Sequence, residues 1–314
     1  MKRLVVCSDG LWNRPGAPAN SNVALLSNAI VPNAGGSVVQ ITLTDRLDAR
    51  GESICALYQA LAANYVPGDQ IWLFGFSRGA YVVRSLAGMI RNVGLIRKDC
   101  SGKLAEAWHI YRTRWGADAR NAVTFRDAHS HQPTIKFLGV WETTGENGVP
   151  ADTTDGFHDR RLSTWVENAY HALAIDEASR SLVPCLWLTG PERSRTEQCW
   201  FSGTHRDMGG MGQNMAFANT SLAWMAERAA SLGLELDRTF LSAAMAARDS
   251  SETFENSLRS GNARRSAQVR AIGVTNQDET VHPSAEQLYL RNHRYRPANL
   301  QHYLGRDEQI QLPL

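Results

Sequence analysis

The pentapeptide 75–79 reads Gly-Phe-Ser-Arg-Gly and places a serine between two glycines in the pattern G-x-S-x-G. The apolar run Ile71–Phe74 precedes it, and a helical pattern over Ala80–Ile90 follows it. A strand, a sharp turn and a helix form the context in which this pattern exposes a serine as a nucleophile. We therefore expect Ser77 to attack carboxylic esters and to form an acyl-serine. The alternative is a serine that only caps the helix.

A serine hydroxyl needs a histidine to accept its proton and a carboxylate to orient that histidine. In this pattern the acid follows the serine along the chain and the histidine follows the acid. Glu142 comes directly after the apolar run Ile135–Trp141, and His205 comes shortly after Cys199–Phe201. Because the carboxyl ends of parallel strands meet at one edge of a sheet, we expect Glu142 and His205 to lie beside Ser77.

Two alternatives stay open for these partners. Asp207 rivals Glu142 as the acid, and His282 rivals His205 as the base. His205 is preferred because it follows a predicted strand, whereas His282 begins a late surface segment. The remaining histidines, His171 among them, lie on predicted helices or polar stretches with no strand before them.

An acyl transfer also needs two backbone N–H groups for the oxyanion. Arg78, the residue after the nucleophile, is expected to supply one of them. The second comes from the loop after an early strand, so Gly10 or Leu11, which follow the run Leu4–Cys7, is the expected donor. Asp9 fits a supporting role, because an Asp before a Gly commonly accepts hydrogen bonds from the amides of its own loop.

Apolar runs alternate with helical patterns along the chain. The runs typical of strands buried on both faces are Leu4–Cys7, Ile71–Phe74, Ile135–Trp141 and Cys199–Phe201. Apolar residues at helical spacing span residues 54–65, 80–90, 162–173 and 222–229. This alternation predicts an α/β fold of the α/β-hydrolase kind, with a mainly parallel sheet and helices on both faces. Residues 144–159, rich in Gly, Asp and Thr, are expected to form a loop near the site.

The chain of 314 residues is expected to form a single domain over 1–314, with the polar, Arg-rich residues 261–314 as a peripheral C-terminal extension. A net charge of +2 argues against nucleic acid as a partner. The five cysteines never form a CxxC pair, which argues against a zinc site and a disulfide framework. We expect no metal ion and no organic cofactor.

The first apolar run is too short for a signal peptide, and no run of about 18 apolar residues occurs. We therefore expect synthesis in the cytoplasm without a cleaved signal peptide or a transmembrane segment. Export by a route that needs no cleaved signal is compatible with this.

Several long motifs resemble those of a known family. They are Asp9–Asn13, Asn22–Leu26, Leu73–Tyr81, Phe137–Trp141, Asn168–Glu177, Trp200–Gly203, His205, Asp207, Gly209–Gly210 and His282–Ser284. The chain resembles the α/β-hydrolase family called domain of unknown function 2235, which includes type VI secretion phospholipase effectors of the first lipase class. The resemblance implies a Ser-Asp-His triad, an ester or lipid substrate, transient contact with a membrane surface, and a secretion or immunity partner.

Carried over by position, the serine, acid and histidine of that family fall on Ser77, Glu142 and His205. The family usually reads Trp-Asp-Thr-Val where this chain has Trp-Glu-Thr-Thr at 141–144, and its glycine-rich stretch is absent from residues 40–51. Two functions from different classes follow: a serine esterase or phospholipase, and a catalytically impaired binding or interaction module on the same fold. A metal-dependent phosphatase is disfavoured, because Cys7 stands where such an enzyme needs its aspartyl nucleophile.

Overall fold

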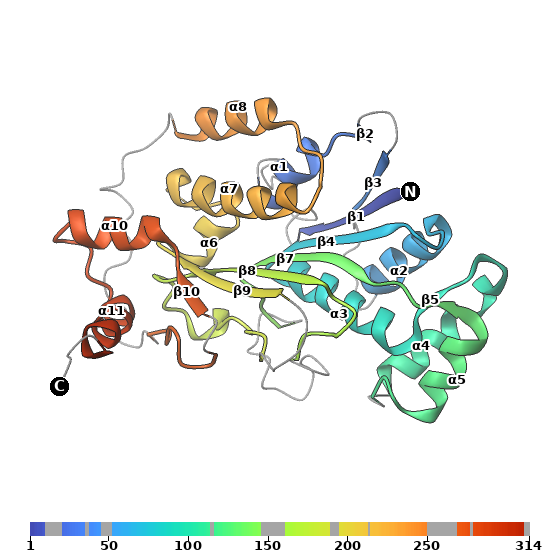
Figure 1. Ribbon diagram of the computed structural model, residues 1–314. Helices are drawn as coiled ribbons and strands as arrows, with labels where there is room; N and C mark the ends of the chain where they lie inside the picture. The colour runs from blue at the N-terminus through green and yellow to red at the C-terminus, as the bar shows by residue number, and fades with distance from the viewer. Residues whose placement is uncertain are drawn as a thin grey trace.

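An eight-stranded sheet forms the centre of the protein (Figure 1). The computed structural model describes residues 1–9, 21–34, 38–44, 52–113, 116–145, 161–188, 195–212, 214–249, 269–276 and 279–310. Within these residues the strand order is β10-β9-β8-β7-β4-β1-β3-β2. The parallel strands are β1 (Lys2–Asp9), β3 (Val38–Thr44), β4 (Gln70–Phe76), β7 (Ile135–Trp141), β8 (Asn168–Ala174), β9 (Arg195–Phe201) and β10 (Glu279–Val281). The edge strand β2 (Asn33–Ala34) runs antiparallel to β3.

Helices cover both faces of this sheet, as Figure 1 shows. One face carries α2 (Glu52–Asn64), α3 (Arg78–Val93), α4 (Leu104–Arg112) and α5 (Arg120–His129). The other face carries α1 (Asn22–Ala29), α7 (Met215–Ser231) and α8 (Arg238–Asp249). The shorter elements are β5 (Leu95–Ile96), η1 (Lys98–Lys103), β6 (Ser130–His131), η2 (Arg180–Leu182) and α6 (His205–Met208). This arrangement confirms the predicted α/β-hydrolase-like class.

The central strands are apolar along their whole length because both faces are covered. In β4, Ile71 and Leu73 point into the core beneath α2 and α3, whereas Trp72 and Phe74 point into the core beneath α7. Successive residues of a strand face opposite sides, so a strand buried on both faces needs apolar residues at every position. The predicted strands at β1, β4, β7 and β9 are confirmed, as are the helices α2, α3 and α7.

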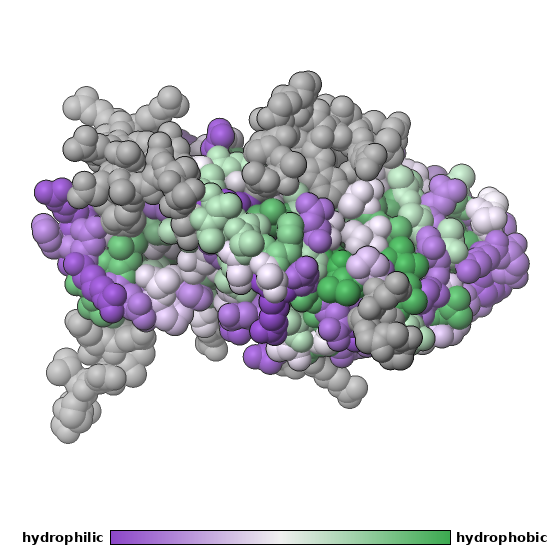
Figure 2. Space-filling view, turned by 90° about the horizontal axis from the view of Figure 1, so that it is seen from above, coloured by the Kyte–Doolittle hydropathy of each residue, from purple (hydrophilic) through white to green (hydrophobic). Residues whose placement is uncertain are grey.

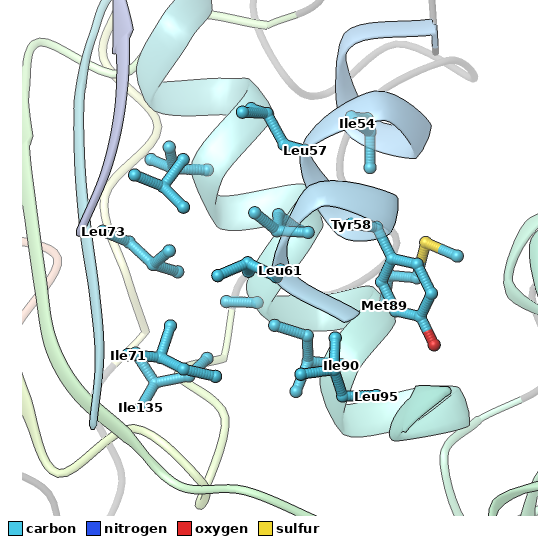
Figure 3. Packing of buried hydrophobic residues seen from close by; sticks show 14 of the residues in the cluster. Ile54, Leu57, Tyr58, Leu61, Ile71, Leu73, Met89, Ile90, Leu95 and Ile135 are labelled. Atoms are coloured by element: carbon cyan, nitrogen blue, oxygen red, sulfur yellow. The ribbon is translucent and has the colours of Figure 1, made fainter. Parts of the chain in front are cut away.

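The core on the α2–α3 side shows how this packing works. Leu61 of α2 faces Leu73 of β4, and Leu57 and Ile71 belong to the same cluster (Figure 3). Each such side chain contributes about 1.5–3 kcal/mol when it is fully buried. In the view of Figure 2, hydrophilic residues gather at the two ends of the molecule and at the lower centre, and hydrophobic residues lie between them.

The helix predicted over residues 162–173 is wrong, because residues 168–174 form β8. Every residue of β8 is buried, so its apolar residues, which also fit a helical spacing, mark a strand inside the sheet. A short apolar run that is buried all round does not distinguish a strand from a helix by periodicity. His171 therefore lies on a central strand and not on a helix.

The order of the strands creates a switch point between β1 and β4. The chain leaves β1 toward β3 on one side and returns to β4 on the other side. Ligands of open α/β sheets bind at the carboxyl ends of the strands where this order reverses. Ser77 directly follows β4 and so lies at this edge.

The C-terminal residues contribute to the sheet and to a small core at its far edge. Strand β10 pairs in parallel with β9, and α10 (Pro283–Arg291) and α11 (Ala298–Ile310) pack beside it. The division of the chain into one domain and a peripheral extension from residue 261 stays a prediction. In the part of the chain that is described, none of the helices is both long enough and apolar enough to cross a membrane.

Gly139 tests how closely α7 approaches the sheet. A Cβ atom at this position in β7 would lie 2.6 Å from Met225 Sδ and 2.6 Å from Phe137 Cε1. Gly139→Ala should therefore lower the free energy of unfolding by about 1–3 kcal/mol, measured by urea denaturation. Gly102→Ala is the control, because nothing lies within 4 Å of its Cβ. Equal unfolding midpoints for the two variants would contradict the close packing.

Candidate active site

Ser77 occupies a strained turn between β4 and α3. Its backbone has φ 54° and ψ −117°, a left-handed conformation that is rare for residues other than glycine. A Cβ atom on Gly75 would lie 2.6 Å from the carbonyl oxygen of Gly79, and one on Gly79 would overlap the carbonyl oxygen of Ser8. The two glycines of the G-x-S-x-G pattern are therefore required by the turn itself. The Ser77 side chain makes no capping hydrogen bond to α3, unlike a serine whose role is to cap a helix.

A hydrogen-bonded series joins Ser77 to a histidine and a carboxylate. Ser77 Oγ lies 3.0 Å from His205 Nε2, and His205 Nδ1 lies 2.9 Å from Glu142 Oε2. Glu142 is fully buried and His205 nearly so, whereas Ser77 is partly exposed. With a proton on Nδ1, the ring donates to Glu142 and its Nε2 can accept the proton of the Ser77 hydroxyl.

Glu142 is held on all sides at the end of β7. Its Oε1 accepts a hydrogen bond from the Ala174 N–H at 2.8 Å. Arg270 donates to both carboxylate oxygens, from Nη1 to Oε1 at 2.8 Å and from Nη2 to Oε2 at 2.9 Å. Burial raises the pKa of Glu142, but the Arg270 charge and the His205 hydrogen bond outweigh burial and lower it to about 2. Glu142 is therefore ionised at neutral pH.

Strained backbone conformations coincide with this series. Among the residues that the structure describes, Ser77 and Glu142 are the non-glycine residues with positive φ, at 54° and 47°. Such conformations cost about 1–3 kcal/mol each and persist only where the surroundings impose them. Both residues directly follow central strands, which fix the position of the turn.

The structure does not bring the rival acid and base into this series. Asp207 Oδ2 accepts hydrogen bonds from the backbone N–H and the hydroxyl of Thr204, at 2.7 and 2.8 Å, and so caps α6. His282 Nδ1 accepts from the Ser284 N–H at the start of α10, and its ring stacks on Phe201 with 4.6 Å between centroids. Asp207 and His282, which the sequence offered as the alternative acid and base, therefore make contacts that stabilise the fold and do not contact Ser77.

The segment before His205 is positioned by two carboxylates. Asp176 Oδ2 accepts from the Gly203 N–H at 2.6 Å, and Glu177 Oε2 accepts from the His205 N–H at 3.2 Å. Tyr295 donates from its hydroxyl to Asp176 at 3.0 Å, and burial raises the pKa of Asp176 to about 6. These contacts fix the turn that presents the histidine ring to Ser77.

The segment after Glu142 is positioned by a buried, neutral histidine. The Thr143 N–H donates to His171 Nε2 at 3.2 Å, and burial together with the nearby charge of Arg84 lowers the pKa of His171 to about 3. The hydroxyl of Thr144, itself buried, lies 3.3 Å from Ser77 Oγ. Thr144 therefore gives the Ser77 hydroxyl a polar contact besides His205.

The expected oxyanion donors are described only in part. The Arg78 N–H is the first of α3 and directly follows Ser77. Asp9 accepts a hydrogen bond from the hydroxyl of Ser21, the residue that caps α1, and so connects the end of β1 to that helix. Gly10, Leu11 and residues 146–159 of the predicted loop lie outside the described residues. Within the described ranges, no group of three or more His, Cys, Asp or Glu side chains is arranged to hold a metal ion.

Sequence reasoning missed Arg270. It lies in a polar, Arg-rich part of the chain with no motif around it, and its contact with Glu142 spans 128 positions. Asp176 and Glu177 were included in a family motif, but nothing in their own sequence indicates that they hold the segment of His205.

Comparisons with known proteins place the sequence in a family. Residues 47–228 match the model of the family described as T6SS, phospholipase effector Tle1-like, catalytic domain. An uncharacterised protein of Saccharomyces cerevisiae is 34% identical over 135 residues, which are 40% of this chain and 19% of that protein. The chain thus spans about a fifth of the length of this curated relative.

Solved structures resemble the chain at low sequence identity. An uncharacterised protein from Pseudomonas aeruginosa is 15% identical with a TM-score of 0.45, over 80% of this chain and 49% of that one. The Tle1 effector bound to the VgrG spike of the type 6 secretion system is 15% identical with a TM-score of 0.38, over 68% of this chain and 52% of that one. The RedJ thioesterase of Streptomyces coelicolor is 14% identical with a TM-score of 0.38, over 72% of this chain and 89% of that one.

The family match includes Ser77, Glu142 and His205 and ends before Arg270. It confirms the resemblance to type VI secretion phospholipase effectors that the motifs indicated. Because the match spans more than half of the 314 residues, the chain belongs to the family of Tle1-like catalytic domains of type VI secretion phospholipase effectors.

Proposed function

We propose that the protein is a serine esterase of the phospholipase A kind, which cleaves carboxylic esters of lipids through an acyl-serine. The observation that carries this proposal is the hydrogen-bonded series from Ser77 through His205 to Glu142, at 3.0 and 2.9 Å. The strained turn at Ser77 supports it, because such a turn holds the hydroxyl away from both the strand and the helix.

In the proposed reaction, His205 Nε2 accepts the Ser77 proton while Oγ attacks the ester carbonyl carbon. The negative charge that develops on the carbonyl oxygen is stabilised by the Arg78 N–H and by a second N–H from Gly10 or Leu11. His205 then donates its proton to the alcohol that leaves. Water repeats these steps on the acyl-serine and releases the fatty acid. Glu142 keeps the imidazole in the required tautomer throughout.

Membership of the family supports a lipid ester as the substrate. By extension, we propose that the protein contacts a membrane surface while it acts and that it has a secretion-system or immunity protein as a partner. The relative named Tle1 effector is described as bound to the VgrG spike, which is the precedent for a secretion-system partner.

Ser77→Ala should abolish hydrolysis of p-nitrophenyl butyrate and of phospholipid vesicles, because it removes the hydroxyl that contacts His205 Nε2. It should also abolish labelling by a fluorophosphonate probe. Ser231→Ala, which removes an exposed hydroxyl at the end of α7, is the matched control and should react as the wild type does. A wild-type protein that neither hydrolyses esters nor takes the label would favour the alternative of a catalytically impaired binding module.

Glu142→Gln should lower kcat by about 10³-fold or more, because the amide can donate to the ring and favour the wrong tautomer. Asp207→Asn and His282→Ala should cost less than about tenfold, since both residues have structural contacts outside the series. The three variants are compared by kcat/KM after circular dichroism has shown that each is folded. If Asp207→Asn and His282→Ala lose more activity than Glu142→Gln, the acid and base are assigned to the wrong residues.

Removal of divalent metal ions should leave the rate unchanged, because the proposed chemistry uses only side chains and backbone N–H groups. The measurement is ester hydrolysis before and after dialysis against EDTA. Loss of activity that added Mg²⁺, Ca²⁺ or Zn²⁺ restores would argue for metal-assisted hydrolysis instead.

A further inference from the structure

We propose that Arg270 is a positioning residue of this site, which holds the Glu142 carboxylate ionised and oriented toward His205. The effect on the rate rests on the proposed esterase function. The effect on the ionisation of Glu142 does not, and it is tested separately below.

The geometry is that of a two-pronged clamp. Arg270 Nη1 and Nη2 each donate to a different oxygen of Glu142, at 2.8 and 2.9 Å. The same two nitrogens also donate to the carbonyl oxygens of Ala174, at 2.8 Å, and Leu182, at 2.5 Å. A guanidinium fixed by two carbonyls and paired in this way defines the plane of the carboxylate as well as its charge.

This orientation matters because Glu142 has a longer and more flexible side chain than an aspartate. Only Oε2 contacts His205 Nδ1, while Oε1 accepts from Ala174. A rotation of the carboxyl group would break both contacts. The clamp removes that freedom, so it supplies the preorganisation that the longer side chain lacks.

The charge of Arg270 matters because both groups are buried, with 0% of the Glu142 side chain and 4% of the Arg270 side chain exposed. A buried carboxylate without a cationic partner favours its protonated form. A protonated Glu142 would no longer accept the Nδ1 proton of His205. Arg270 thus keeps the acceptor available.

Besides Arg270 itself, the described titratable groups whose charges act on this pair include His205, His171 and Asp176. His205 contacts Glu142 directly, and His171, next to Arg84, is held neutral by burial. Asp176 is close enough to Arg270 to feel its charge.

The kinetic test compares the pH dependence of kcat/KM for the wild type, Arg270→Met and Arg270→Lys. In Arg270→Met, Glu142 stays buried but loses its cation, so the Glu142–His205 pair takes up a proton at higher pH. The acid limb of the profile should move up by about one pH unit or more, which lowers kcat/KM by about tenfold or more at pH values below the limb. Arg270→Lys keeps the charge and should keep the limb near its original pH. Its kcat should be lower, because a lysine cannot donate to both Glu142 oxygens from two fixed nitrogens.

Arg228→Met is the matched control. Arg228 also donates from two nitrogens to one carboxylate, that of Glu197, with both distances 2.9 Å, and it does not contact the series. This variant should leave the acid limb where it is. If Arg270→Met lowers kcat/KM equally at every pH and the acid limb does not shift, the proposal is overturned. Loss of a residue that only stabilises the fold would have this result.

A second test needs no enzyme activity. The free energy of unfolding is measured between pH 4 and pH 8 for the wild type, Arg270→Met, Glu142→Gln and the double variant. If Arg270→Met does not fold, Arg270→Gln replaces it, because that variant also lacks the charge. In the wild type the pKa of Glu142 is lower in the folded than in the unfolded chain, so its ionisation stabilises the fold above about pH 4.5 and this stability is lost as the pH falls. Without Arg270 the folded pKa rises, and ionisation destabilises the fold instead.

The stability difference between wild type and Arg270→Met should therefore shrink as the pH falls toward 4. In the Glu142→Gln background that part of the pH dependence should disappear, while any contribution from Asp176 should stay and cancel in the cycle. The same pH dependence in both backgrounds would overturn the proposal. If the wild type proves inactive on esters, the esterase function fails and this cycle still decides whether Arg270 keeps Glu142 ionised.

Discussion

The burial of one carboxylate governs the architecture of the site. Glu142 has no contact with solvent, and its two oxygens must be satisfied by donors that the fold itself brings to them. Those donors come from the end of β8 at Ala174, from the turn after β9 at His205, and from Arg270 ahead of β10. Three neighbouring strands, β7, β8 and β9, must therefore end at the same edge, and the parallel register of the sheet satisfies this demand.

The same edge carries the strain that the site needs. Ser77 and Glu142 both have left-handed backbone conformations, and they follow the adjacent strands β4 and β7. The Ser77 N–H donates to the carbonyl oxygen of Trp141, so one hydrogen bond connects the two turns. The well-packed cores on both faces of β4 and β7 supply the stability that holds these turns in place.

Short sequence motifs predicted those parts of the fold and the candidate site that depend on neighbouring residues. The G-x-S-x-G turn, the strands on either side of it and the partners Glu142 and His205 follow from short motifs and from the rule that parallel strands end at one edge. Strand β8 was missed because burial on both faces removes the alternation that distinguishes a strand from a helix. The contact of Arg270 with Glu142 could not be predicted from the sequence, since it joins distant parts of the chain and no local pattern encodes it.

The late position of Arg270 has a consequence for how the molecule is made. Because a ribosome builds the chain from its N-terminus, the strands that carry Ser77, Glu142 and His205 leave it before residue 270 exists. A nascent chain at that stage has a carboxylate that must be buried and no guanidinium to neutralise it. A later step of synthesis therefore supplies the counter-charge, after the strands of the candidate site have left the ribosome.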